Sequence, residues 1–415
     1  MSLTSIKLAH PTKQISGTVQ LTGSKSESNR ALIIQAISSG KVKIQNLSHA
    51  DDTVLLTNAL NVALQIDDQV KTIDIGPAGT AMRFLTSYLN LLPGDFVLTG
   101  TQRMQQRPIG ILVDALNSLG ASIDYTQTSG YPPLRIRGPF QQSATSVNIK
   151  GDISSQYISS LLLIASALKD GLTLDIEGEL TSRPYVTMTL DMLAEVGIQH
   201  SWQENSIHIA PQQARPSTLY IEPDWSAASY WYAMVALSEQ GSIRLPGLKK
   251  NSLQGDIAIA EIMTHFGVKT TFEADAIYLK KTAIASDKKL FDFKSCPDLA
   301  QTVVVVASAL KRDVSFTGLE TLKIKETDRI AALQNEIAKY GAVLQEDGET
   351  YHLHSQHVQD PGSLTIETYE DHRMAMAFAP LALVFQQVQI LEPHVVEKSY
   401  PTFWDDLRKQ GFALT

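Results

Sequence analysis

The sequence predicts an α/β protein built as two similar lobes, each containing three copies of one repeated unit. A pattern of buried-looking helix, β-rich strand, amphipathic helix and further strands can be traced six times along the chain. The length of 415 residues exceeds one typical domain. A break at residues 223–226 leaves three copies on each side, so two lobes are expected.

The first helix of each copy is apolar nearly all round, which is typical of a helix buried inside a layer. These helices are expected at residues 30–38, 81–91, 156–168, 227–237, 299–310 and 373–384. A strand is expected after each of them, at residues 42–47, 96–99, 172–176, 242–245, 314–317 and 388–391.

The second helix of each copy is amphipathic. In one of them Ile111, Leu112, Ala115, Leu116 and Leu119 follow the spacing of a single buried stripe. Glycines are expected to end such helices in a left-handed residue, at Gly120, Gly197, Gly267, Gly341 and Gly411. Prolines lie near three of the helix starts, where a missing N–H is harmless, at Pro108, Pro184 and Pro401.

Composition and charge exclude several classes of protein. Lys plus Arg number 35 against 43 Asp plus Glu, a net charge of −8, which argues against a nucleic-acid-binding surface. Cys296 is the only cysteine, so no disulfide is expected within the chain and a reducing compartment is favoured. Residues 1–14 lack the apolar stretch of a signal peptide, and no apolar run approaches the roughly 20 residues that span a bilayer. We expect a soluble cytoplasmic protein, with neither nucleic acid nor membrane as a partner.

Polar residues gather at the helix starts, where a buried core does not explain them. The clearest case is Gly23–Arg30, because a helix N-terminus offers unpaired N–H groups and a partial positive charge. Lys25 and Arg30 would add full charges there, and Ser26 shares a helical face with Arg30. The segment predicts either a phosphate or carboxylate site or an ordinary Ser-rich helix cap.

Further helix starts of the first half carry the same kinds of residue. The candidates are Gly79, Thr80, Arg83, Arg107, Ser154, Ser155, Gln156, Ser182 and Tyr185. A glycine lets a ligand approach the backbone, hydroxyls and an amide suit a phosphate and a ring hydroxyl, and arginines suit carboxylates. The alternatives are a plain turn at residues 76–80, a helix cap at residues 154–156, and surface ion pairs for the arginines.

The corresponding helix starts of the second half carry more charge. The candidates are Asp298, Lys325, Glu326, Arg329, His372, Arg373 and Lys398. Lys325 and Arg329 are expected on one helical face with Glu326 beside them, and a solvated charged face is the alternative. Asp298 could cap the following helix or act as a base. His372 could be a satisfied histidine near a cap. Collected into one cleft, the two halves would bind two multiply charged anions.

Two other signals are weaker. His352, His354 and His357 resemble a metal-binding tract, but alternation along a short strand explains them better. The chain has neither a P-loop nor a strand-linked GxGxxG motif, so the use of ATP or a dinucleotide has no support.

Taken together, the motifs resemble the EPSP synthase family, the 3-phosphoshikimate 1-carboxyvinyltransferases of the enolpyruvyl transferase superfamily. The matching segments span nearly the whole chain: GSKSESNRA, AGTAMR, QRPIG, SSQY, SRPY, PDLA, KETDR, DHRMAM and EKSYP. The resemblance implies an inside-out α/β barrel, with three βαβαββ-type units and parallel buried helices in each lobe. It also implies that the N-terminal segment returns to the second lobe, so the lobes would be residues 1–21 plus 226–415 and residues 22–225.

The resemblance implies transfer of the enolpyruvyl group of phosphoenolpyruvate to the 5-hydroxyl of shikimate 3-phosphate, in the shikimate pathway of aromatic amino-acid biosynthesis. It implies no cofactor and no metal, and we expect a monomer. Shikimate 3-phosphate would contact Lys25, Ser26, Arg30, Ser154, Ser155, Gln156, Ser182, Tyr185, Asp298 and Lys325. Phosphoenolpyruvate would contact Lys25, Gly79, Thr80, Arg107, Gln156, Arg329, Arg373 and Lys398, with Arg83 and His372 in supporting positions.

The same match assigns catalytic roles to Asp298, Glu326, Lys25 and Lys398. Glu326 would protonate the methylene carbon and Asp298 would contact the hydroxyl as a base, with Lys398 as an alternative acid or base. Lys325 and Arg329 should favour ionised Glu326, whereas an acid must carry a proton, so the closed complex would have to favour the protonated form. Two departures from the family pattern are Pro77, where many relatives have Asn, and Thr321, where Asn or His is frequent.

Two rival interpretations remain. UDP-N-acetylglucosamine enolpyruvyl transferases share the fold and the donor but generally use a loop cysteine as acid, whereas Cys296 adjoins Pro297 and Asp298. A non-catalytic anion-binding or scaffold protein is the second, and the presence of Asp298, Glu326 and Lys398 disfavours it.

Overall fold

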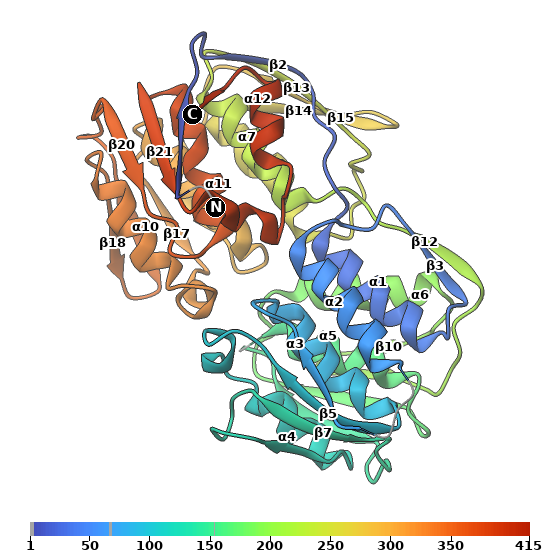
Figure 1. Cartoon of the computed structure of the whole chain (residues 1–415). Coiled ribbons are helices and arrows are strands. Elements are labelled where there is room, and N and C mark those ends of the chain that lie inside the picture. Colours follow the sequence, from blue (N-terminus) through green and yellow to red (C-terminus); the bar gives the residue numbers. More distant parts are fainter. Residues whose placement is uncertain (1–3, 66–68, 153) are drawn as a thin grey trace. The chain divides into compact units, whose positions relative to one another are not determined.

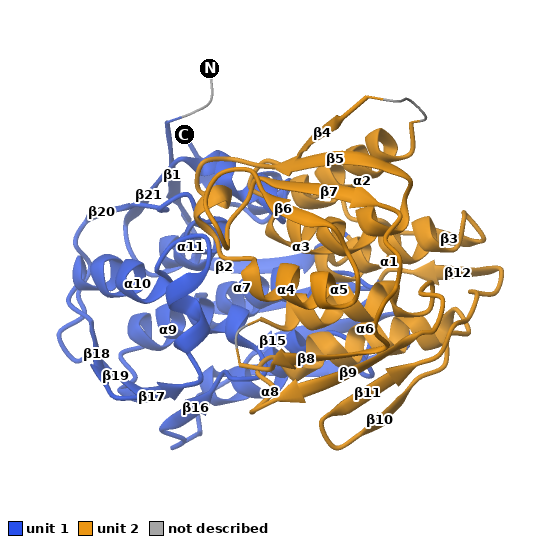
Figure 2. Cartoon of the chain, turned by 90° about the horizontal axis from the view of Figure 1, so that it is seen from below, with its two compact units in different colours: residues 1–22, 222–415 blue, residues 23–221 orange. Residues whose placement is uncertain are grey.

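The computed structural model describes residues 4–65, 69–152 and 154–415, and the chain forms two compact units. Unit 1 comprises residues 1–22 and 222–415, and unit 2 comprises residues 23–221 (Figure 2). The second boundary lies at 221/222 rather than at the expected 225/226. Glu222 explains the difference, because its carboxylate accepts hydrogen bonds from Trp225 Nε1 and from the backbone N–H of Lys249. These bonds tie residues 222–225 to unit 1.

Unit 2 contains the first three copies of the repeat. Its helices are α1 (Lys25–Ile37), α2 (Asp51–Ala63), α3 (Gly79–Tyr88), α4 (Gly110–Ser118), α5 (Ser155–Ala165) and α6 (Arg183–Glu195), with 3-10 turns η1 (Leu89–Leu91) and η2 (Met104–Gln106). Its strands are β3 (Val42–Gln45), β4 (Lys71–Asp74), β5 (Gly94–Thr99), β6 (Ile123–Tyr125), β7 (Leu134–Gly138), β8 (Ser146–Lys150), β9 (Leu172–Glu177), β10 (Ser201–Gln203), β11 (Ser206–Ile209) and β12 (Ser217–Tyr220).

Unit 1 contains the last three copies and the N-terminal strands. Its helices are α7 (Trp225–Leu237), α8 (Ile259–Ile262), α9 (Ala300–Ala309), α10 (Arg329–Ala338), α11 (His372–Phe378) and α12 (Phe403–Lys409). Its 3-10 turns are η3 (Gly255–Ala258), η4 (Met263–Phe266), η5 (Pro297–Leu299), η6 (Glu320–Ile324), η7 (Ala379–Leu383) and η8 (Pro393–Lys398). Its strands are β1 (Ser5–Ala9), β2 (Gln14–Thr18), β13 (Gln240–Pro246), β14 (Val268–Phe272), β15 (Ala276–Lys281), β16 (Leu290–Asp292), β17 (Val314–Thr317), β18 (Val343–Asp347), β19 (Thr350–His354), β20 (Ser363–Ile366), β21 (Gln387–Leu391) and β22 (Ala413–Leu414).

The four-stranded sheets of the described chain repeat one topology. In four of them the strand before a buried helix pairs in parallel with the strand after it, whereas in the fifth β2 pairs in parallel with β13. Two antiparallel strands complete each sheet. The strand orders are β4-β5-β7-β6 and β8-β9-β11-β10 in unit 2, and β2-β13-β15-β14, β16-β17-β19-β18 and β20-β21-β1-β22 in unit 1. The first copy is shorter than predicted. Only residues 64–70 separate α2 from β4, fewer than the stretch that holds β6 and β7 in the next copy, and β3 pairs with β12 alone.

Two strands do not pair with the strand that follows the next helix along the chain. Each pairs instead with a strand from the other half of the sequence. β2 comes before α1 in the chain but pairs in parallel with β13, with Gln14 opposite Gln240. β12 comes before α7 but pairs in parallel with β3, with Ser217 opposite Val42. β1 lies between β21 and β22, so one sheet of unit 1 combines both ends of the chain.

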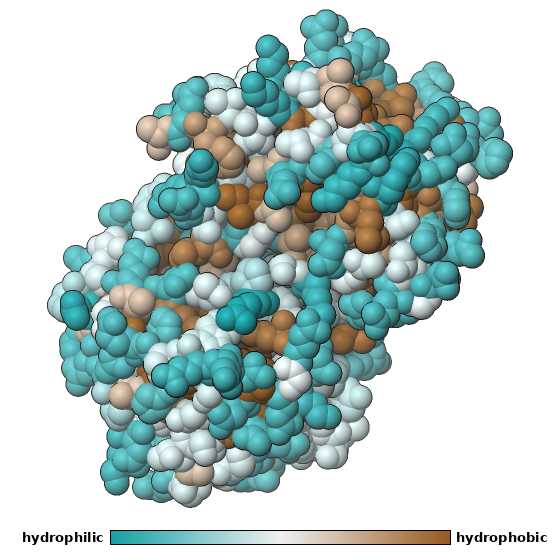
Figure 3. Space-filling view, turned by 180° about the vertical axis from the view of Figure 1, so that it is seen from behind, coloured by the Kyte–Doolittle hydropathy of each residue, from teal (hydrophilic) through white to brown (hydrophobic). Residues whose placement is uncertain are grey.

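The predicted buried helices form the interior of each unit. In unit 2, α1, α3 and α5 contact one another (Figure 1), and in unit 1, α7 contacts α9 and α11. Every residue of α9 is buried, and every residue of α7 except Ser226. α1 begins at Lys25 rather than at Arg30, because Ser24 Oγ accepts the N–H of Glu27 and caps the helix earlier. Hydrophilic residues make up most of the face drawn in Figure 3, with hydrophobic residues between them.

Candidate active site

Arg329, the first residue of α10, holds three carboxylates of unit 1 in one network. Its Nη1 lies 3.1 Å from Asp298 Oδ1, its Nη2 2.9 Å from Glu326 Oε2, and its Nε 2.7 Å from Asp371 Oδ2. Burial lowers the pKa of Arg329, but Asp371, Glu326 and Asp298 together raise it above its usual value, so the guanidinium stays charged. Arg329 therefore fixes the spacing of the two carboxylates that the sequence predicts to be catalytic.

Asp298 is surrounded by cations. Arg373 Nη2 lies 2.9 Å from its Oδ2, while Arg329 Nη1 and Lys325 Nζ lie 3.1 and 3.9 Å from its Oδ1. Burial raises the pKa of the Asp298 carboxyl, but Arg373, Lys325 and Arg329 outweigh burial and hold the pKa well below its usual range. The carboxylate is therefore ionised, as a general base must be.

Glu326 bridges two cations with its two oxygens. Its Oε2 accepts a hydrogen bond from Arg329 Nη2, and its Oε1 lies 3.2 Å from Lys398 Nζ at the end of η8. The side chains of Glu326 and Lys398 are 17% and 10% exposed, so the pair is largely screened from water but still accessible to a ligand. The contact gives the two predicted acid candidates a direct path for exchanging a proton.

The prediction that Lys325 and Arg329 share a helical face is wrong. α10 begins at Arg329, and Lys325 and Glu326 lie in the loop between η6 and α10. The helix begins late because Asp328 caps it: its Oδ1 accepts the N–H groups of Ile330 and Ala331. Lys325 is therefore positioned by a loop and by its contact with Asp298.

Asp298 does not cap the helix that follows it. It lies in η5, α9 begins at Ala300, and Leu299 occupies the N-cap position without a side-chain bond. The corresponding aspartate of the next copy does cap its helix, because Asp371 Oδ1 accepts the N–H of Arg373 at 2.8 Å. Both oxygens of Asp298 are therefore left to the surrounding cations.

The first residues of α11 lie behind and within this network. His372 is 1% exposed, and its Nδ1 lies 3.6 Å from Asp371 Oδ1. Arg373 Nη1 donates to Tyr230 Oη at 3.3 Å, and its Nη2 donates to Asp298. Burial raises the pKa of Tyr230 to about 12, so the phenol is neutral near pH 7. Arg373 thus faces the predicted base, and His372 supports the helix start.

In unit 2, Lys25 begins α1 and pairs with a carboxylate of α2. Lys25 Nζ lies 3.1 Å from Asp52 Oδ2. The Asp52 side chain is 3% exposed and that of Lys25 is 14% exposed. The ammonium is therefore positioned by a buried partner while part of its surface stays accessible.

Arg30 is buried in unit 2 among neutral groups. Its Nε donates to Thr189 Oγ1 at 2.7 Å, its Nη1 to the Ser26 carbonyl at 2.9 Å, and its Nη2 to Ser159 Oγ at 3.1 Å and the Tyr185 carbonyl at 3.2 Å. Burial lowers the pKa of Arg30 to about 10, which still leaves it charged near pH 7. A guanidinium has five N–H donors, so these bonds leave one Nη1 hydrogen for a ligand.

Gly79, the first residue of α3, faces two arginines. A Cβ at this position would lie 2.6 Å from Arg107 Nη1 and 3.2 Å from Arg83 Nη1. Arg83 is 5% exposed and donates to the carbonyls of Gly79 at 3.1 Å and Pro108 at 3.3 Å. Arg83 therefore braces the segments that carry Gly79 and Arg107, and the missing side chain at Gly79 lets Arg107 approach the helix start.

Hydroxyls and an amide occupy the starts of α5 and α6. Ser154 caps α5, because its Oγ accepts the N–H of Gln156 at 3.3 Å, and Gln156 Nε2 donates to Thr80 Oγ1 at 3.3 Å. Ser155 is the first residue of α5 and is buried. Ser182 occupies the N-cap of α6 with a left-handed φ of 54° and makes no side-chain cap bond. Strained backbone of this kind is common at ligand sites. Ser182 therefore differs from Ser154, whose side chain caps its helix.

Three buried aspartates were missed by the sequence analysis: Asp52 in unit 2, and Asp256 and Asp371 in unit 1. Asp52 and Asp371 lie at helix starts, so the signal that found the cations could have found them. Asp256 lies in η3, where no such signal exists, and Ser226 Oγ donates a hydrogen bond to it. Burial, and next to it the charge of Asp298, raise the pKa of Asp256 to about 7.

Of the two departures noted above, Thr321 lies in η6, and its Oγ1 is buried without a hydrogen-bond partner among the described residues. Pro77 precedes α3 and has no N–H to donate. The part of the chain that the structure describes has no group of three or more His, Cys, Asp or Glu side chains placed to hold a metal ion. None of its helices has the length and apolar character needed to cross a bilayer.

Comparisons with known proteins agree over the whole chain. A family model described as EPSP synthase (3-phosphoshikimate 1-carboxyvinyltransferase) matches residues 9–407. A protein of Bacteroides fragilis (strain YCH46) named 3-phosphoshikimate 1-carboxyvinyltransferase is 48% identical over 403 residues, covering 97% of each chain. The EPSP synthase of Acinetobacter baumannii has a similar structure, with a TM-score of 0.78 at 20% identity over 99% of this chain and 100% of that one. The enolpyruvyl transferase NikO from Streptomyces tendae shares the fold, with a TM-score of 0.74 at 14% identity over 99% of this chain and 98% of that one.

Proposed function

The chain belongs to the EPSP synthase family, and we propose that the charged helix starts of its two units carry out that family's reaction. In this reaction the enolpyruvyl group of phosphoenolpyruvate is transferred to the 5-hydroxyl of shikimate 3-phosphate, giving 5-enolpyruvylshikimate 3-phosphate and phosphate. The observation that carries the proposal is the network around Arg329, which places an ionised carboxylate, Asp298, beside a carboxylate–lysine pair, Glu326 and Lys398.

We propose that unit 2 supplies most of the contacts to shikimate 3-phosphate. Arg30 has one Nη1 hydrogen left after its bonds to protein, which suits one oxygen of the ring carboxylate, and Ser26 adjoins it. Ser154, Ser155 and Ser182 offer hydroxyls for the phosphate, and Ser182 is free of a cap role. Gln156 and Tyr185 would flank the ring, and Asp298 and Lys325 of unit 1 would meet the reacting 5-hydroxyl.

The proposed contacts to phosphoenolpyruvate come from both units. In unit 2 they are Lys25, Gly79, Thr80, Arg107 and Gln156, and in unit 1 they are Arg329, Arg373 and Lys398. The close approach of Arg107 to Gly79 supports this assignment, because it brings a guanidinium to the N–H groups of a helix start. Phosphoenolpyruvate carries a phosphate and a carboxylate, so a set of several cations in an acidic protein focuses it by charge.

The reaction requires three proton movements at carbon and oxygen, which these residues can share. A proton from the Glu326–Lys398 pair adds to the methylene carbon, and the 5-hydroxyl oxygen bonds to the neighbouring carbon while Asp298 takes the hydroxyl proton. The tetrahedral intermediate then returns a methyl proton to the Glu326–Lys398 pair as the bond to the phosphate oxygen breaks, and the leaving phosphate takes up the proton held by Asp298. Lys25, Arg329 and Arg373 would stabilise the charges of the donor and of the leaving phosphate.

The Glu326–Lys398 contact explains how Glu326 can deliver a proton although it lies beside Arg329. Arg329 stabilises ionised Glu326, but Lys398 lies 3.2 Å away and can hold the proton that Glu326 passes to carbon. The two residues therefore act as one acid in this proposal. Glu326→Gln should remove most of the turnover, and near-normal turnover of Glu326→Gln would show that Lys398 alone is the acid.

One assay tests the proposed function against both rivals. Purified protein is incubated with phosphoenolpyruvate and either shikimate 3-phosphate or UDP-N-acetylglucosamine, and phosphate release is followed. Release with shikimate 3-phosphate alone is expected. Release with the nucleotide sugar would favour the related transferase, and binding without release in either reaction would favour a scaffold.

We also propose that the enzyme acts as a cytoplasmic monomer. The single cysteine, Cys296, is buried, and burial raises the pKa of its thiol well above the usual value, which suits a protein that carries no disulfide chemistry. Light scattering coupled to size-exclusion chromatography tests the oligomeric state. A mass near 45.5 kDa is expected, and twice that value would contradict the proposal.

A further inference from the structure

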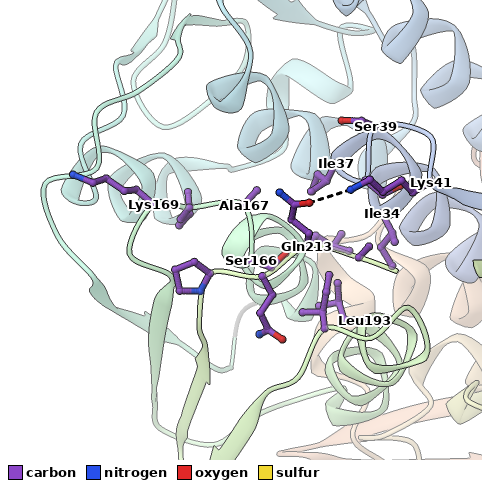
Figure 4. A pocket seen from close by; sticks show the side chains of 16 residues that line it. Ile34, Ile37, Ser39, Lys41, Ser166, Ala167, Lys169, Leu193 and Gln213 are labelled. Carbon is purple, nitrogen blue, oxygen red and sulfur yellow. Dashed lines mark hydrogen bonds between the residues drawn. The ribbon is translucent and has the colours of Figure 1, made fainter. Parts of the chain in front are cut away.

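Unit 2 contains a cavity of about 620 Å³ that none of the proposed substrate residues lines. It lies where α1, α5 and α6 end, next to residues 211–214 (Figure 4). The proposed substrate residues lie at the opposite, N-terminal ends of the same helices, and the 13 residues of α1 make a helix about 20 Å long. The cavity is therefore a separate place in unit 2, with a volume within the range of roughly 300–1,000 Å³ typical of small-molecule sites.

Aliphatic side chains make up part of the cavity wall. Ile34 and Ile37 come from α1, Leu163 from α5, Leu193 from α6, and Ile198 from the segment after it. The exposed surface of the cavity is nonetheless more polar than apolar, so the site suits a ligand that combines an apolar part with a polar group.

One amine is held at the mouth of the cavity. Lys41 Nζ donates to Gln213 Oε1 at 3.0 Å, and Figure 4 shows this bond between two side chains that line the cavity. Lys169 also borders the cavity, but its side chain points away from it in the same view. No Asp or Glu is among the residues that line the cavity, although the chain has 43 of them. The local charge therefore favours an anion.

Ser166 provides a polar group at the base of the cavity. It is 4% exposed, and its Oγ is buried without a hydrogen-bond partner among the described residues. A buried hydroxyl without a partner is unfavourable, and rotation about χ1 can turn this one toward a ligand. The cavity thus combines a cation, aliphatic side chains among polar ones, and one buried hydroxyl without a partner among the described residues.

A single charge on the ligand fits this arrangement better than two. The helices present their C-terminal ends here, which carry partial negative charge and disfavour a phosphate dianion. Lys41 can balance one carboxylate at the mouth. We propose that the cavity binds a small monocarboxylate with an apolar ring or branched body, whose carboxylate pairs with Lys41 and whose body lies against Ile34, Leu163 and Leu193, with Ser166 as a further hydrogen-bond partner.

Calorimetric titration of the full chain with 3-phenylpropionate tests the proposal, with shikimate 3-phosphate present at saturation so that the proposed acceptor site is occupied. Saturable binding of one equivalent is expected. Lys41→Met should weaken it at least tenfold, whereas the matched control Lys169→Met should change it less than twofold. The neutral amide 3-phenylpropanamide should bind wild type and Lys41→Met equally.

A second variant distinguishes this cavity from any other carboxylate site. Ala167 borders the cavity and is exposed, so Ala167→Trp should fill the space and abolish binding while kcat for phosphate release stays within twofold of wild type. Absence of saturable binding to wild type would overturn the proposal. Undiminished binding to Ala167→Trp, equal losses in the two lysine variants, or tighter Lys41-dependent binding of inorganic phosphate would overturn it as well.

Discussion

The cations at the helix starts of the two units differ in the partners that hold them. In unit 1, Arg329 contacts three carboxylates, and Arg373 and Lys398 contact one each. In unit 2, Lys25 contacts the carboxylate of Asp52, whereas the bonds of Arg30 go to hydroxyls and backbone carbonyls.

This difference corresponds to two roles of a buried cation, which are to bind an anionic ligand and to position carboxylates. A buried cation bonded only to neutral groups keeps its charge for an anionic ligand, but it lowers the stability of the empty protein. A cation bonded to carboxylates instead holds those carboxylates in position and favours their ionised form. Arg30 of unit 2 is therefore arranged to bind an anion, and the network around Arg329 in unit 1 to hold and move protons. The four predictions below test this contrast, from the largest expected effect on activity to the smallest.

Asp298→Asn should have the largest effect. The amide cannot accept the hydroxyl proton, so kcat should fall by roughly 10²- to 10⁴-fold while binding of shikimate 3-phosphate changes little. Steady-state phosphate release and calorimetry measure the two quantities. Asp347→Asn, at a side chain that is 80% exposed, is the matched control and should leave both unchanged. If Asp298→Asn retained kcat within tenfold, the network of unit 1 would be structural rather than catalytic.

Ser154 can be tested for its two roles with two substitutions. Ser154→Ala removes the cap of α5 and should lower the free energy of unfolding by about 1 kcal/mol. Ser154→Asp keeps a capping oxygen but adds a negative charge, so stability should be retained while affinity for shikimate 3-phosphate falls roughly 100-fold. Urea denaturation and calorimetry give the two values. Equal acceptor affinity in Ser154→Asp and wild type would mean that Ser154 is a cap and nothing more.

Gly79→Ala should affect the donor rather than the acceptor. The added methyl group would lie 2.6 Å from Arg107 Nη1, so the arginine must move away from the helix start. We expect KM for phosphoenolpyruvate to rise about tenfold, since one charged hydrogen bond of roughly 1.5 kcal/mol is weakened. KM for shikimate 3-phosphate serves as the internal control. A rise in both KM values would indicate a general disturbance of unit 2.

Asp256→Asn should change pH dependence more than activity. The native state raises the pKa of Asp256 to about 7, so between about pH 4 and pH 7 the folded protein binds a proton that the unfolded chain has lost. The stability of wild type should therefore fall as pH rises through this range. Asp256→Asn should remove roughly 1–3 kcal/mol of that fall between pH 5 and pH 8, as measured by urea denaturation. Parallel pH profiles of the two proteins would show that Asp256 is ionised in the native state.

The sequence predicted the interior of the fold well because its periodicity is strong. Helices that are apolar all round can only be buried, and α7 and α9 follow the expected segments closely, whereas α11 ends at Phe378 and the 3-10 turn η7 continues the expected segment to Leu383. The boundary at 221/222 could not be found in this way, because it depends on which unit binds the Glu222 carboxylate. The short first copy could not be predicted either, because a repeated pattern does not show how few residues separate α2 from β4.

For the candidate site, residue type at helix starts predicted the cations but not their partners. Asp371 holds Arg329 although 42 residues separate the two in sequence, and α10 and α11 are brought together through their shared contact with α9. Lys325 was placed on a helix because its spacing from Arg329 is helical, but the Asp328 cap starts the helix later. Local capping chemistry and long-range ion pairs, rather than periodicity, decide these positions.

The sheet that joins both ends of the chain constrains the order in which the protein folds during synthesis. β1 leaves the ribosome first, yet both of its neighbours, β21 and β22, are among the last segments made, and Leu8 pairs with Val388 and Leu414. Unit 2 is continuous from residue 23 to residue 221 and can form as soon as it emerges. β1 must wait unpaired until β21 and β22 have been made, so it is the strand of a nascent chain that most needs protection from aggregation.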